Sequence, residues 1–179
     1  MDDLNTKANI CNLSKEEKYN LLNKLSDSDC ITEDDLKILN ILSFDEGDEI
    51  RSQVAEILEN ADYKDAEGIL VRLLQDKDGL VRAIACDSLR YSNSIEILNL
   101  LINIIKKDRV DLVRGYAANS IANIIKNVNK EENEYVTFFE ELLKKEKVKW
   151  VRINIYKSLY LLGMKSYLSK LLDVLNDRQ

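Results

Sequence analysis

The 179-residue sequence contains no proline, no histidine and only five glycines. Proline and glycine are the usual helix breakers, so their scarcity favours long helices joined by short turns. The lack of histidine excludes Ser-His and Cys-His nucleophile systems and histidine zinc sites. The three cysteines, Cys11, Cys30 and Cys86, are scattered and show neither a metal-ligand spacing nor an obvious disulfide framework. We therefore expect no metal and no cofactor.

Signals for catalysis, membrane insertion and secretion are also missing. The sequence has no phosphate-binding P-loop and no Gly-rich dinucleotide fingerprint. No apolar run approaches the roughly 20 residues that a membrane span needs. The first residues, Met1, Asp2 and Asp3, lack the basic region that opens a secretory signal. We expect a cytoplasmic protein that is not an enzyme and has no catalytic residues.

Charge is distributed unevenly along the chain. Residues 1–75 contain 8 Lys+Arg and 18 Asp+Glu, a net charge of -10, whereas residues 76–179 contain 18 and 14, a net charge of +4. An acidic half disfavours nucleic-acid binding, because contacts to phosphate need cations. It favours a protein partner with a basic surface, attracted over long range. An ordinary acidic solvated face is the alternative interpretation.

One motif recurs through the sequence. Residues 76–89 read DKDGLVRAIACDSL, residues 108–121 read DRVDLVRGYAANSI, residues 146–159 read EKVKWVRINIYKSL, and 45–58 are a degenerate copy. The arginine of each copy sets the period, with intervals of 31, 32 and 38 residues between Arg51, Arg82, Arg114 and Arg152. Self-similarity at such a period indicates a repeat architecture.

Each copy of the motif predicts an amphipathic helix. Apolar residues stand one before, three after and seven after the arginine, and an acid stands six before it. In the second copy these are Val81, Ala85, Leu89 and Asp76. At 100° per residue the three apolar positions fall within about 80°, which is the width of a buried helix stripe.

The remaining periodicity predicts pairs of helices. We expect helices over about 14–25, 33–43, 46–60, 65–75, 79–92, 94–107, 110–128, 134–146, 148–162 and 165–176. Capping boxes at Ser14 and Ser43, and capping residues at Thr32 and Ser94, mark helix starts. Residues 1–13 show no strong helical periodicity.

The motif resembles the HEAT-repeat family, specifically its short bacterial form, also seen in phycobilin-lyase-like proteins. The resemblance covers roughly residues 33–177. It implies an all-α superhelix, or solenoid, of about four to five HEAT-like helical hairpins. We expect a single domain over 1–179, with an N-terminal capping segment (1–32), repeats (33–162) and a C-terminal capping helix (163–179). The resemblance also implies that the acids and arginines cap helices or pair between repeats as a structural ladder. The residues of this ladder are Asp76, Arg82, Asp108, Arg114 and Arg152.

The resemblance further places a binding surface on the second helix of each pair, along the concave face of the solenoid. Positions one, five, eight and nine after each arginine lie away from the core stripe. The candidate partner-binding residues chosen from these positions are Glu56, Glu59, Asp87, Arg90, Tyr91, Asn119, Asn123 and Lys157. Ala83, Gly115 and Ala122 occupy the same positions. Gly115 indicates close approach either of a ligand or of the first helix of its own repeat.

The sequence favours a non-catalytic protein–protein interaction scaffold that binds through this surface and the acidic N-terminal half. One version is a bacterial immunity or inhibitor protein that masks a basic toxin, and another is an adaptor within a bacterial complex. The alternatives are a phycobilin-lyase-like chromophore-handling factor and a HEAT-like nucleic-acid-binding protein. The oligomeric state stays open, because acidic and basic halves of two copies also suit head-to-tail association.

Overall fold

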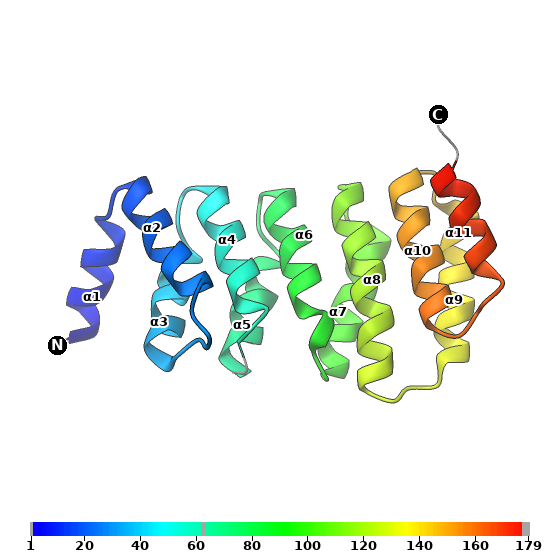
Figure 1. The fold of residues 1–179 in the computed structure, drawn as a ribbon, viewed down its shortest axis with the longest axis horizontal. Coiled ribbons are helices and arrows are strands. Elements are labelled where there is room, and N and C mark those ends of the chain that lie inside the picture. Colours follow the sequence, from blue (N-terminus) through cyan, green and yellow to red (C-terminus); the bar gives the residue numbers. More distant parts are fainter. Residues whose placement is uncertain (1, 62–63, 177–179) are drawn as a thin grey trace. The chain divides into compact units, whose positions relative to one another are not determined.

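The computed structural model describes the backbone of residues 2–61 and 64–176 and the side chains of 7–61 and 64–176. The chain forms two compact units, Met1–Ser88 and Leu89–Gln179. Within the described residues the secondary structure is entirely helical (Figure 1). The all-α helical-repeat class that the sequence predicts is therefore confirmed.

The first unit consists of six helices in two layers. They are α1 (Asp2–Cys11), α2 (Lys15–Ser26), α3 (Glu33–Leu42), α4 (Asp48–Leu58), α5 (Lys64–Leu73) and α6 (Gly79–Ser88). Helices α2, α4 and α6 pack side by side, and α1, α3 and α5 form the second layer (Figure 1). Helix α1 corrects the sequence analysis, which assigned no helix to residues 1–13.

The second unit opens with a short 3-10 helix, η1 (Leu89–Tyr91), where the sequence predicted a continuous helix to residue 92. Five α-helices follow: α7 (Ile95–Lys107), α8 (Asp111–Asn127), α9 (Glu132–Lys145), α10 (Lys149–Leu161) and α11 (Tyr167–Asn176). Helix α10 packs against α8, α9 and α11, so α11 covers one side of the last repeat.

Side-chain capping hydrogen bonds fix the starts of α2, α3 and α7. Ser14 and Thr32 form complete capping boxes, and the Ser94 side chain accepts the backbone N–H of the fourth residue of its motif. The predicted capping box at Ser43 is wrong. Ser43 is instead the C-cap of α3, and Gly47 is the N-cap of α4 without a side-chain hydrogen bond.

The predicted core stripe is buried in every repeat. The twelve side chains at its three positions are each at most 1% exposed. They are Ile50, Val54, Leu58, Val81, Ala85, Leu89, Val113, Ala117, Ile121, Val151, Ile155 and Leu159. The periodicity of the motif therefore reflects burial of one helix face per repeat.

The acid of each motif organises the turn before the second helix. Carboxylates of the four acids accept the backbone N–H two residues later, at 2.8–2.9 Å. The arginine six residues on returns to this turn, because its Nη1 donates to the carbonyl oxygen of the same acid, at 2.7–3.1 Å in the four copies. The turn is thus held from both sides by residues six apart.

Candidate functional site

The arginines of the motif also connect neighbouring repeats. Arg51 donates from Nε and Nη2 to the two carboxylate oxygens of Asp76 at 2.7 and 2.8 Å. In the second unit, Arg114 donates to Glu146 in the same bidentate way at 3.0 and 3.3 Å. A planar guanidinium suits such paired hydrogen bonds. These contacts occupy the guanidinium groups inside the fold.

The buried setting affects the carboxylates of these pairs. Burial acts to raise the pKa of the Asp76 carboxyl, but hydrogen bonds from Arg51 and from the Asp78 backbone outweigh it, so the pKa lies below its usual value. Burial also acts to raise the pKa of Glu146, but the hydrogen bond from Arg114 acts to lower it, and the pKa lies below its usual value. Arg152 differs, since its Nη2 donates to the Tyr156 hydroxyl at 2.7 Å. All of these groups serve the fold.

The second helices of the first unit present three of the predicted partner-binding acids. Glu56 is exposed on α4, Glu59 follows it at the end of that helix, and Asp87 is half-buried on the adjacent helix α6. Residues 1–88 contain 10 Lys+Arg and 21 Asp+Glu, a net charge of -11. The structure thus groups these acids on neighbouring helices of one strongly acidic unit.

The other predicted residues lie in the second unit, where residues 89–179 have 16 Lys+Arg and 11 Asp+Glu. Tyr91 is 62% exposed, and the Arg90 guanidinium lies 4.8 Å from the centroid of its ring. Asn119 and Asn123 are half-buried on α8, where Asn123 donates to the Asn119 carbonyl at 2.8 Å. Lys157 is exposed on α10.

Three small residues of the predicted surface are not available to a ligand. Ala83 and Ala122 are fully buried, and Gly115 is buried as well. A Cβ atom on Gly115 would lie 2.4 Å from Nε1 of Trp150, at the start of α10. Gly115 therefore admits the next second helix, α10, rather than a ligand or the first helix of its own repeat. The free second-helix surface is narrower than the sequence predicted.

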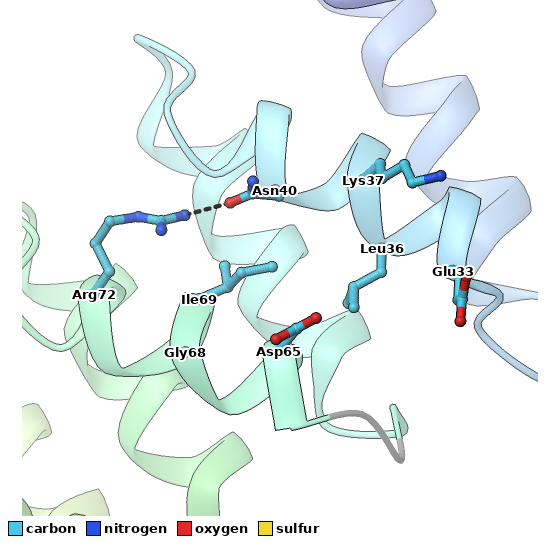
Figure 2. Close-up of a pocket in the computed structure, with 8 residues that line it drawn as sticks. All are labelled: Glu33, Leu36, Lys37, Asn40, Asp65, Gly68, Ile69 and Arg72. Atoms are coloured by element: carbon cyan, nitrogen blue, oxygen red, sulfur yellow. Dashed lines mark hydrogen bonds between the residues drawn. The ribbon is translucent and has the colours of Figure 1, made fainter. Parts of the chain in front are cut away.

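A groove with a volume of about 600 Å³ lies between the first helices α3 and α5 and was not predicted from the sequence (Figure 2). Its lining residues are Glu33, Leu36, Lys37 and Asn40 of α3, and Asp65, Gly68, Ile69 and Arg72 of α5. Each set has the spacing i, i+3, i+4, i+7, which defines one helix face. The two sets are offset by 32 residues, one repeat period, and this match was the available sequence signal.

The described residues contain no group of three or more His, Cys, Asp or Glu side chains placed to hold a metal ion. In the same described ranges, 2–61 and 64–176, no helix combines the length and apolar character needed to cross a membrane.

The chain is an α-helical repeat protein, because paired helices recur at a period near 32 residues. Each copy has one buried stripe and one acid–arginine turn. The comparison with family models identifies which kind. Residues 36–122 match the family of HEAT repeats, which supports the resemblance carried by the repeated motif. No curated protein matches the chain.

Proposed function

We propose that this protein is a non-catalytic scaffold that binds a basic protein partner through second-helix side chains of its acidic unit. Helical repeats expose extended surfaces suited to protein recognition, and HEAT repeats generally mediate protein interactions. The observation that carries the proposal is the placement of Glu56, Glu59 and Asp87 on the adjacent helices α4 and α6 within a unit of net charge -11.

Electrostatics would dominate the encounter. Surface carboxylates attract a basic surface over about one Debye length, roughly 8 Å at physiological ionic strength. Charges at the rim of an interface mainly affect the association rate and its salt dependence. We therefore expect association to slow steeply as salt rises.

The test is capture of partners from a native lysate on the immobilised chain, followed by kinetics with the purified partner. Glu56→Lys, Glu59→Lys and Asp87→Lys together should lower the association rate at least about tenfold, as expected when steering charges are reversed. Asp173→Lys is the control, because Asp173 is an exposed acid on α11 of the other unit. Equal binding by the triple variant and the control would refute this surface.

Within this proposal, a bacterial cytoplasmic immunity or inhibitor protein is the more specific version. This version predicts that the captured partner is an enzyme or toxin with a basic active surface. Its activity should fall to zero when one copy of this chain is added per partner molecule, because that surface is then masked. An adaptor instead leaves the activity of its partner unchanged and recruits a third component. The chromophore-handling and nucleic-acid alternatives stay predictions without a supporting contact among the described residues.

A further inference from the structure

Arg72 at one end of the α3–α5 groove is held in a fixed position. Its Nη2 donates to Asn40 Oδ1 at 2.9 Å (Figure 2). The same Nη2 also donates to the buried Ser43 hydroxyl. Its guanidinium carbon lies 4.1 Å from the centroid of the Phe44 ring, a favourable cation–π contact. A guanidinium held in this way loses little further rotamer freedom when it binds a ligand.

Among the described residues, no carboxylate pairs with the charge of Arg72. Both of its described hydrogen-bond acceptors are neutral, whereas Arg51 has a bidentate carboxylate partner. Within the described part of the chain, its Nε is buried and has no hydrogen-bond partner. Burial lowers the pKa of the Arg72 guanidinium, and no described carboxylate offsets this effect. Such a cation gains most from an anionic ligand that completes its donors.

Gly68 keeps the middle of the groove open. It lies inside α5, where glycine is less favourable for the helix than alanine. A Cβ atom at Gly68 would meet no atom of the described residues within 4 Å, so their packing does not require glycine there. The positions one repeat period away carry Leu36 and Leu100. The missing side chain therefore leaves groove volume that the repeat pattern would otherwise fill.

The other end of the groove is acidic. Asp65 and Glu33 are both exposed and line this end, away from Arg72 (Figure 2). The cation beside them, Lys37, pairs with Asp34 at 2.7 Å. The groove thus presents a cation at one end and carboxylates at the other, with Leu36 and Ile69 between them.

The spacing of these charges selects a helical ligand. Asp65 and Arg72 are seven residues apart on α5, which corresponds to about 10.5 Å along one helix face. A helix lying along the groove repeats this distance between side chains at i and i+7 on one face. In an extended strand, side chains at i and i+3 lie about 10 Å apart, but they point to opposite faces of the strand.

We propose that the α3–α5 groove binds a helical segment of a partner protein whose acidic side chain pairs with Arg72 and whose basic side chain, two turns away, pairs with Asp65 and Glu33. This is helix-in-groove recognition with charge at both ends. The groove belongs to the first-helix layer, so partner binding in the groove and partner binding on the second-helix surface can be tested independently.

The probe for this site is an alanine-rich helical peptide with Glu and Lys seven residues apart. The control peptide has the same composition with Glu and Lys five residues apart, which puts them about 140° apart around the helix axis. Backbone amide resonances of the full chain are followed by NMR during each titration. We expect the first peptide to shift amides of 33–40 and 65–72 and the control peptide to leave them unchanged.

Three variants test the mechanism. Gly68→Leu restores the residue of the neighbouring repeats, so it should keep or raise the melting temperature while abolishing peptide binding. Arg72→Gln should weaken binding at least about tenfold, as for loss of a charged hydrogen bond, and Arg72→Lys, which keeps the charge, should weaken it less. Arg109→Gln is the matched control, because Arg109 is exposed in the other unit. Equal shifts with both peptides, no shifts at millimolar peptide, or full binding by Gly68→Leu would each overturn the proposal.

Discussion

The same substitution, glycine to alanine, should have opposite effects at two helix positions of this protein. Each change gains about 1 kcal/mol of intrinsic helix propensity. At Gly68 a Cβ atom meets no atom of the described part of the chain within 4 Å, so the whole gain should appear as stability. For a chain of this size, 1 kcal/mol corresponds to a rise of about 2–4 °C in the melting temperature.

At Gly115 the new Cβ atom would lie 2.4 Å from Nε1 and 2.9 Å from Cδ1 of Trp150. The rigid indole, which also makes a T-shaped contact with Tyr116, must move by about 1 Å to restore a normal contact. Overpacking of this kind costs about 1–3 kcal/mol. After the helix gain is subtracted, Gly115→Ala should destabilise the protein by about 1 kcal/mol.

Urea unfolding followed by far-ultraviolet circular dichroism measures both free energies of unfolding. A double-mutant cycle isolates the cause, because Trp150→Ala removes the indole. In that background Gly115→Ala should stabilise by about 0.5–1 kcal/mol, which gives a coupling energy of about 2 kcal/mol. If Gly115→Ala alone stabilises the protein as much as Gly68→Ala, the packing argument is wrong.

Three further predictions concern charge and turns. Asp76→Asn leaves the Arg51 guanidinium, 5% exposed, without its anion, and should cost about 3–5 kcal/mol in urea unfolding. The pKa of Asp76 is lowered on folding, so its contribution to stability is present above the unfolded pKa near 4 and is lost as the pH falls through the folded pKa. If the free energy of unfolding of Asp76→Asn falls as steeply with acid as that of the wild type, this argument is contradicted. Burial and the hydrogen bond to Glu140 raise the pKa of Tyr167 to about 12. The contribution of Tyr167 to stability is therefore present below about pH 10 and lost between about pH 10 and 12. Tyr167→Phe should remove its late phenolate step from an absorbance titration. Asn129 has a left-handed φ of 50° after α8, so Asn129→Gly should raise the unfolding free energy by about 0.5 kcal/mol, and a loss of stability would contradict the strain argument.

Much of the fold followed from local sequence signals repeated along the chain. Burial of the core stripe was predictable because period and side-chain type agree in four copies. The acid–arginine turn was predicted as a ladder, but its double use was not evident. Asp76 accepts the Asp78 backbone N–H in the turn and also pairs with Arg51. The cap of α6 is Asp78, whose Oδ1 accepts the backbone N–H groups of Leu80 and Val81.

Errors arose where neighbours in space decide the outcome. Ser43 and Glu46 fit a capping box, yet Ser43 ends α3 and accepts a hydrogen bond from Arg72. Gly115 lies on the outward face by helical geometry but is covered by Trp150 of α10. A helical wheel places a residue relative to its own axis and carries no information about the next helix.

The sequence alone determined the helical repeat, its period and the residues that face the core, because these depend on periodicity within one helix. Tertiary structure decided which outward positions remain exposed, because lateral packing of α8 against α10 closes Gly115, whereas α3 and α5 leave Gly68 open. It also showed that Arg51 and Arg114 are satisfied internally while Arg72, a less conspicuous arginine, has only neutral described acceptors. The acceptors around Arg72 come from α3 and the turn after it, far away in the sequence, so no motif in the chain revealed them.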